Sequence, residues 1–192
     1  MFNDLFQKDT VSVAKELLGM YLVHKSNEGM TVGKIVETEA YLQNDPGSHS
    51  HKGMTKRNAQ MFGKAGTAYV YLIYGVYHCF NVVTNKEGGG EAVLIRALEP
   101  VKGIALMKKR RKTDNEKNLC NGPGKLVIAM GVTKEHNGTN LLSGSLSLLP
   151  RKTNDRFEIC TSTRIGISVG KELPYRFFIQ KNPFISKPAL PR

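Results

Sequence analysis

The stretch from Tyr69 to Asn81, YVYLIYGVYHCFN, constrains the fold more than any other part of the chain. Its side chains alternate with a period of two, which is typical of strands because successive residues point to opposite faces. Gly75 divides the stretch, so we expect two short strands that meet near Tyr74 and Gly75 in a hairpin. Four of the chain's seven tyrosines lie here. This composition fits a core hairpin and also a surface that stacks against a flat ligand.

The charge of the chain favours the second interpretation. Lysine and arginine number 28 and aspartate and glutamate 16, for a formal net charge of +12 in 192 residues. Such an excess favours polyanions, with nucleic acid as the first candidate and an anionic membrane surface as the second. No run is apolar enough to span a membrane, and the N-terminus resembles neither a signal nor a transit peptide. We therefore expect a cytoplasmic protein, nucleoid-associated if bacterial, with one domain over residues 1–192.

The cysteines and histidines argue against a metal centre. The three cysteines, Cys79, Cys120 and Cys160, are an odd and widely spaced set, so we expect free thiols. His49 and His51 could join Glu37 or Glu39 around a metal ion, but their spacing matches no established zinc pattern. We expect neither a metal nor a cofactor.

Two glutamates stand out in the strand that we predict from Thr31 to Tyr41. Strict alternation places Ile35, Glu37, Glu39 and Tyr41 on one face. Glutamate is disfavoured in strands unless it is solvated or has a use. An exposed edge, an ion pair with one of the many cations, and a catalytic role all remain open.

A second charge interrupts an apolar strand, which we predict from Ala92 to Leu98. Arg96 lies in its middle, and a buried guanidinium needs a partner. We expect Arg96 either to neutralise Glu37 or Glu39 or to face a polar cavity. Residues 42–66 form a long irregular loop, from which His49 or His51 could approach a pocket.

The helices and the remaining strands follow from cap and turn signals. Thr10 is expected to cap a helix that stops at Gly19, and Glu99-Pro100 to open a second helix that KKRRK, residues 108–112, closes. That basic run is either a solvated face or a phosphate contact. Pro123 is suited to the first turn of a third helix, where Gly124 and Lys125 would form an anion seat. Further strands are expected at 145–149, 156–160 and 175–180, with RIGI, residues 164–167, joining the last two.

The order of these elements predicts an α+β fold. We expect one domain with a curved, largely antiparallel and barrel-like β-sheet, flanking helices and the protruding hairpin.

Six motifs in this order resemble the alkyladenine (3-methyladenine, or methylpurine) DNA glycosylase family. They are VETEAY, SHS with the downstream TKRN and MF, the hairpin YVYLIYGVYHCFN, LIRALEP, NGPGKL and RIGI, spread over residues 36–167. Each motif is weak alone, and their specificity comes from the shared order.

The resemblance implies a role for each matching residue. Glu39 corresponds to the general base. Arg96 and the main chain of Ile165 correspond to groups that fix the attacking water. The pocket side chains would be Tyr41, His49, Tyr71 and Asn81, with Asn81 screening out normal bases. Residues that would contact DNA are Tyr74 as the inserted wedge, Val76, Gly124, Lys125 and Lys134. Val76 replaces the methionine of human-type members, and a loop one residue shorter leaves His51 as the alternative to His49. Tyr69 and Tyr77 receive no role and are expected to pack.

The activity implied by the resemblance is monofunctional glycosidic hydrolysis in base excision repair. The enzyme would flip alkylated or deaminated purines from double-stranded DNA through the minor groove, as a monomer without cofactor or metal, and leave an abasic site. Two rivals are a non-catalytic nucleic-acid-binding module and a metal-dependent nuclease built on Glu37, Glu39 and His49. The lesion range is not encoded in any motif.

Overall fold

The strand β2 (Gly29–Tyr41) organises the fold of this computed structural model, which describes residues 2–73 and 75–187. One edge of β2 pairs with β5 (Glu91–Lys102), and the other edge is shared by β1 (Tyr21–Ser26) and β8 (Arg176–Ile179). The sheet continues in the order β3-β4-β5-β2-β1-β6, and β7 joins it through β8. The remaining strands are β3 (Ala68–Ile73), β4 (Tyr77–Thr84), β6 (Leu146–Leu149) and β7 (Ile159–Ser162).

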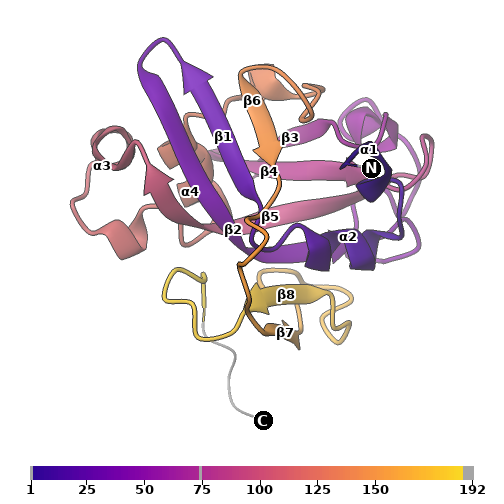
Figure 1. Ribbon diagram of the computed structural model, residues 1–192. Coiled ribbons are helices and arrows are strands. Elements are labelled where there is room, and N and C mark those ends of the chain that lie inside the picture. Colours follow the sequence, from indigo (N-terminus) through magenta and orange to yellow (C-terminus); the bar gives the residue numbers. More distant parts are fainter. Residues whose placement is uncertain (1, 74, 188–192) are drawn as a thin grey trace.

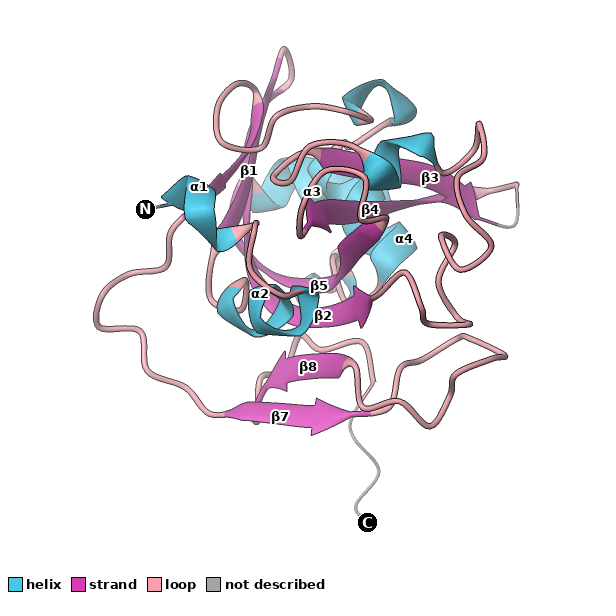
Figure 2. Ribbon diagram, turned by 90° about the vertical axis from the view of Figure 1, so that its right-hand side faces the viewer, coloured by secondary structure: helices cyan, strands magenta, loops and turns pink. Residues whose placement is uncertain are grey.

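Every pairing in the sheet is antiparallel, and the sheet curls on itself (Figure 2). The helices are α1 (Phe2–Leu5), α2 (Thr10–Glu16), α3 (Ile104–Arg111) and α4 (Pro123–Met130), with short 3₁₀ turns at Ala59–Phe62, Glu116–Asn118 and Lys134–His136. Helix α2 lies against β2, where the Thr38 hydroxyl donates to the Ala14 carbonyl, and α4 packs beside β4 and α3 (Figure 1). The predicted α+β fold with a curved antiparallel sheet is confirmed.

The β3–β4 hairpin confirms the pattern of the tyrosine-rich stretch. Tyr69, Tyr71 and Ile73 lie opposite Asn81, Cys79 and Tyr77, so the polar and aromatic residues of both strands share one face. The other face carries Val70, Phe80 and Val82 into the main hydrophobic core. Tyr74, the predicted wedge, lies outside the described residues.

Three register shifts distort the ladder between β2 and β5, and two of them lie next to Glu37. Ile35 lies opposite Leu98, Glu37 opposite Ala97 and Thr38 opposite Ile95, so Val36 and Arg96 are the extra residues of two bulges. Bulges of this kind re-aim side chains. Ile35 and Val36 are both completely buried in the main core. The prediction that Ile35 shares a face with the two glutamates is therefore wrong.

Local signals misplaced two helix starts. Helix α2 is capped by Asp9, whose carboxylate accepts from the Ser12 amide, while the Thr10 hydroxyl bonds to Glu91 and Thr84 instead. Glu99 and Pro100 do not open a helix, because they continue β5 in its pairing with β2. Helix α3 begins only at Ile104.

Gly103 separates β5 from α3 in a left-handed conformation, with φ of +75°. A Cβ atom there would lie 2.4 Å from the Met30 carbonyl oxygen. Only glycine readily adopts this φ and has no Cβ atom to clash with the carbonyl oxygen. The strand therefore turns into the helix at this residue.

The basic run Lys108–Lys112 closes α3 as predicted, but its cations are largely engaged within the chain. Lys108 pairs with Glu116, and Arg110 pairs with Glu28 and donates to the Ala129 carbonyl. Arg111 donates to the Leu119 carbonyl. The run mainly joins α3 to its neighbours.

The cysteines are free thiols, as predicted: Cys79 and Cys120 are buried and Cys160 is half-buried. Within residues 2–73 and 75–187, no helix is long and apolar enough to cross a membrane.

The buried His24 makes stability depend on pH. Its Nδ1 lies 2.7 Å from the Met130 carbonyl oxygen and its Nε2 lies 3.2 Å from Nε2 of His136. Burial lowers the pKa of His24 below its ordinary value of 6.5. As pH falls, His24 therefore takes up a proton in the unfolded chain before it does so in the folded chain. The contribution of His24 to the free energy of unfolding is complete above pH 6.5 and is lost as pH falls through the folded-state pKa. We expect His24→Gln to lose less stability in mild acid than the unsubstituted chain, measured by denaturant unfolding at several pH values. Equal slopes of unfolding free energy against pH for the two proteins would contradict this role of His24.

Candidate active site

A single cavity of about 360 Å³ gathers most of the residues that the sequence singles out. It lies among the β3–β4 hairpin, the C-terminal half of β2, the start of α4 and the loop between β7 and β8. The predicted residues that line it are Tyr41, His49, Tyr71, Asn81, Arg96, Gly124 and Ile165. His49 lines this cavity and His51 does not, so the geometry favours His49.

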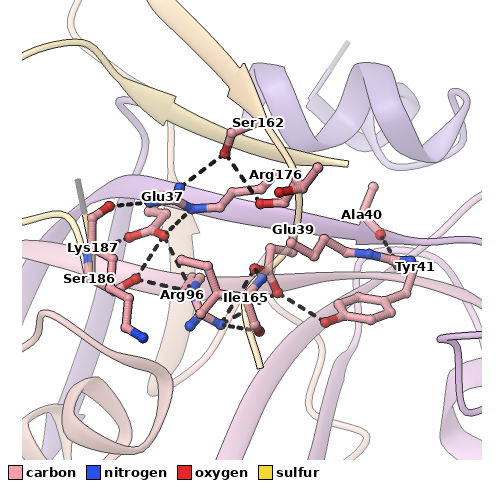
Figure 3. Close-up of polar contacts among 12 residues, drawn as sticks. Glu37, Glu39, Ala40, Tyr41, Arg96, Ser162, Ile165, Arg176, Ser186 and Lys187 are labelled. Atoms are coloured by element: carbon pink, nitrogen blue, oxygen red, sulfur yellow. Dashed lines mark hydrogen bonds and ion pairs between the residues drawn. The ribbon is translucent and has the colours of Figure 1, made fainter. Parts of the chain in front are cut away.

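Glu39 lies directly behind the cavity wall and has no exposed surface. One carboxylate oxygen accepts from the Tyr41 hydroxyl at 2.9 Å and the other from the Ile165 amide at 2.9 Å (Figure 3). Arg96 Nη1 lies 3.5 Å from the carboxylate. Burial raises the pKa of Glu39 above its ordinary value, although Arg96, Ile165 and Tyr41 oppose the rise. A carboxylate in this state is suited to accept a proton.

Arg96 reaches both glutamates because of its position in the β5 bulge. Its Nε lies 3.3 Å from a Glu37 oxygen, its Nη1 lies 3.5 Å from Glu39, and Nη1 also donates to the Ile165 carbonyl at 3.4 Å. The prediction that Arg96 neutralises a buried glutamate is confirmed for both glutamates. Arg96 also lines the cavity, but the lining is mainly aromatic and apolar, so the alternative of a polar cavity is not confirmed.

Tyr41 presents an aromatic ring that is fixed from behind. The Arg164 guanidinium lies 4.7 Å from the ring centroid. Arg164 is itself buried, paired with Asp45 and donating to the Ala40 and Gly170 carbonyls. With its hydroxyl on Glu39 and its ring on Arg164, Tyr41 has little freedom to rotate.

His49 faces Tyr71 across the cavity mouth. Their ring centroids are 4.5 Å apart at 68°, and His49 Nδ1 lies 3.1 Å from the Tyr69 hydroxyl. Burial, reinforced by Arg57, lowers the pKa of His49, so the neutral ring dominates near pH 7. A neutral imidazole can donate or accept a hydrogen bond.

Asn58 holds the loop that carries His49. Its amide nitrogen donates to the His49 and Gly53 carbonyls at 2.8 and 3.0 Å, and its oxygen accepts from the Thr55 amide. We expect Asn58→Ala to leave three backbone groups without these bonds and to lower stability by about 1–3 kcal/mol. Denaturant unfolding measures this loss. Thr113→Ala, in a loop on another part of the chain, is the matched control, and an equal effect of both substitutions would contradict the account.

Asn81 is nearly buried at the back of the cavity. Its amide nitrogen donates to the Tyr69 carbonyl across the hairpin at 3.0 Å. This bond fixes the side chain in the wall beside Tyr69 and Cys79, which line the cavity with it.

A second hollow of about 380 Å³ adjoins the cavity at the start of α4. Gly122, Gly124, Lys125 and Arg111 line it together with Tyr77. The absence of a side chain at Gly124 lets Tyr77 pack closely, since a Cβ there would lie 3.2 Å from the tyrosine. Lys125 Nζ donates to Asn121 Oδ1 at 2.8 Å, and this bond holds the side chain at the first turn of α4.

The end of the β3–β4 hairpin exposes apolar side chains, with Leu72, Val76 and Tyr77 exposed by 43%, 66% and 49%. Lys134 is exposed on the turn Lys134–His136 and lines neither hollow. Both tyrosines that were expected to pack do so, but each also lines a hollow: Tyr77 packs on Gly124 and stays half-exposed, and Tyr69 packs in the wall of the cavity. For Tyr69 the available signal was its spacing of two from Tyr71, because i and i+2 residues of a strand share a face. Tyr77 shares that face through its pairing with Ile73 across the hairpin.

Comparison with known proteins shows the family of this chain. A family profile described as methylpurine-DNA glycosylase matches residues 4–183. A protein of Francisella tularensis is 51% identical over 181 residues, covering 93% of this chain and 94% of that protein. A protein of Methanoculleus marisnigri is 50% identical over 185 residues, covering 95% and 96%. Both are named as candidate 3-methyladenine DNA glycosylases. The chain belongs to the methylpurine-DNA glycosylase family and is therefore a DNA glycosylase.

Proposed function

We propose that the enzyme excises alkylated purines, with 3-methyladenine as the type substrate, and deaminated purines such as hypoxanthine from double-stranded DNA. The observation that carries the proposal is the completely buried Glu39 held beside Arg96 at the wall of an aromatic cavity. The relatives' names supply the class of base. A ring-lined cavity of this kind supports stacking on any purine, and the electron-rich faces of Tyr41 and Tyr71 favour a cationic one.

The reaction begins with extrusion of the damaged nucleotide, because a base inside the duplex hides its glycosidic bond. Tyr74 enters the minor groove and fills the vacated space, and Val76, two residues later in the sequence, contacts the DNA. Extrusion costs roughly a few kcal/mol and is easiest for damaged or mispaired bases. The base then stacks against Tyr41 and Tyr71, hydrogen-bonds to His49, and is screened by Asn81.

Hydrolysis uses a water molecule rather than a covalent intermediate. Glu39 removes a proton from the water, whose oxygen bonds to C1′ while the glycosidic bond breaks and its electron pair leaves with the base. Arg96 and the Ile165 carbonyl hold the water. Alkylation at N3 or N7 makes the purine a good leaving group without protonation. The products are the free base and an abasic site.

Contacts to the sugar-phosphate backbone position the duplex. The amides at the start of α4, with Gly124 and Lys125, hold one phosphate, and Lys134 contributes a further charge. The enzyme acts as a monomer and requires neither metal nor cofactor.

A panel of duplexes, each with one lesion, tests this function. We expect release of 3-methyladenine and hypoxanthine, identified by chromatography of the freed base, and no release from an undamaged duplex. Failure on every damaged purine would reject the proposal. Tyr74→Ala should slow release from a paired lesion more than from an unpaired one, and equal losses would remove Tyr74 from the wedge role.

A further inference from the structure

Glu37 is a second buried carboxylate, two residues before Glu39, that the proposed reaction does not use. It has no exposed surface and does not line the cavity. Arg176 Nε donates to it at 2.7 Å and the Ser186 hydroxyl at 2.8 Å, and the Ser186 amide donates to its other oxygen (Figure 3). Glu37 is therefore placed to act on its neighbours and not on substrate.

Arg96 lies between the two carboxylates and contacts them unequally. On its Nε side, a Glu37 oxygen lies at 3.3 Å and the Ser186 hydroxyl accepts a hydrogen bond at 3.1 Å. On its Nη1 side, Glu39 lies at 3.5 Å. A charge-assisted hydrogen bond is normally about 2.7–2.9 Å long, so Arg96 is not closed on Glu39.

We propose that Glu37 is a positioning residue for the hydrolysis, an inference that rests on the proposed function. It shares the Arg96 guanidinium with Glu39, and together with Ser186 it holds Arg96 at a distance that leaves the Glu39 oxygens able to accept a proton from water.

The electrostatic consequence has a defined sign. The charged and titratable groups around Glu39 are Glu37 and Tyr41 from its own strand, Arg96 from β5, Cys79 from β4 and Arg164 from the β7–β8 loop. Arg176 of β8 lies opposite Glu39 in the sheet and is paired with Glu37. The negative charge of Glu37 raises the pKa of Glu39, and Arg96 lowers it. Replacing Glu37 by glutamine removes the first effect and leaves Arg96 free to strengthen the second. Both changes lower the pKa of Glu39 and make it a weaker base.

The C-terminal segment completes this arrangement. Ser186 bridges Glu37 and Arg96 through one hydroxyl, and Arg176 donates to the Lys187 carbonyl. Earlier in the same segment, Asn182 donates to Glu99 at 2.9 Å and contacts neither Glu37 nor Glu39. Ser186→Ala therefore removes the bridge, whereas Asn182→Ala loosens the same segment and leaves the bridge in place.

The test is the pH dependence of single-turnover base release by Glu37→Gln, Ser186→Ala and Asn182→Ala. We expect Glu37→Gln to release base about tenfold or more slowly at neutral pH, since general-base efficiency falls with basicity. The midpoint of its acidic limb moves to lower pH. Ser186→Ala shifts the midpoint of the acidic limb in the same direction but by a smaller amount. Ser186→Thr restores the original midpoint, and Asn182→Ala leaves it unchanged. Binding to abasic-site DNA stays unchanged in all of them.

The outcomes separate this inference from the function on which it rests. An active unsubstituted enzyme, with an acidic limb that neither Glu37→Gln nor Ser186→Ala moves, overturns the positioning role alone. A Glu37→Gln enzyme that is slower but has the same acidic-limb midpoint as Asn182→Ala also overturns the positioning role, because its loss of rate would then come from altered structure and not from a weaker base. If Glu37→Gln does not fold, the Ser186→Ala midpoint decides the matter. An unsubstituted enzyme that releases no damaged base rejects the proposed function and this inference with it.

Discussion

Glu39→Gln is expected to lower the single-turnover rate of base release by about 10²–10⁴, the range over which a general base contributes. Glutamine has the shape of glutamate and keeps an oxygen for the Tyr41 hydroxyl or the Ile165 amide, but it cannot take a proton from water. Arg96 keeps Glu37 as an ion-pair partner in this variant, so no buried charge is left unpaired and the fold retains its packing. Rapid mixing of excess enzyme with a duplex that contains one hypoxanthine measures the rate.

The matched control for Glu39→Gln is the affinity of the variant for DNA with an abasic site. We expect it to equal that of the unsubstituted enzyme within about twofold, because Glu39 lies behind the cavity wall. A variant that keeps its excision rate would remove Glu39 from the role of base. A variant that loses DNA binding in proportion to its rate would assign Glu39 to binding instead.

Arg164→Met is expected to have the largest effect on stability. Removing one partner of a buried ion pair leaves an uncompensated charge, here Asp45, which is 4% exposed, at a cost of about 3–5 kcal/mol. In a chain of this length the midpoint of thermal unfolding falls by about 2–4 °C for each kcal/mol. The Tyr41 ring also loses the guanidinium behind it. Calorimetry and denaturant unfolding measure the loss.

The double substitution Asp45→Asn with Arg164→Met controls for the charge. With the carboxylate neutralised, we expect it to recover a large part of the stability that Arg164→Met loses, since the penalty comes mainly from the unpaired charge. A double variant no more stable than Arg164→Met would show that Arg164 stabilises through its packing on Tyr41 and Tyr175 and not through its pairing with Asp45.

Local patterns predicted the parts of the site that lie on single strands. The period-two alternation put Tyr69 and Tyr71 on one face of the first hairpin strand and Cys79 and Asn81 on one face of the second. The pairing of Arg96 with a buried glutamate was one of the two arrangements expected for it. These predictions succeed because the facing of a residue along a regular strand depends only on its neighbours in sequence.

Other features depend on contacts between distant residues and could not be predicted in this way. The paired bulges at Val36 and Arg96 arise only when β2 and β5 meet. The Tyr41–Arg164 stack and the bridge from Ser186 to Glu37 join segments that are more than one hundred residues apart. The helix start at Ile104 depends on the close approach of Gly103 to Met30, which overrides the local signal of Glu99-Pro100.

The most direct test of the account is the product that the unsubstituted enzyme forms from a duplex with one 3-methyladenine or hypoxanthine, in EDTA. Hydrolysis by a Glu39-activated water predicts the free base and an unbroken strand that breaks only after alkali treatment, with no protein–DNA adduct on borohydride reduction. Activity that requires a divalent ion, strand cleavage without release of base, or a trapped adduct would contradict the mechanism.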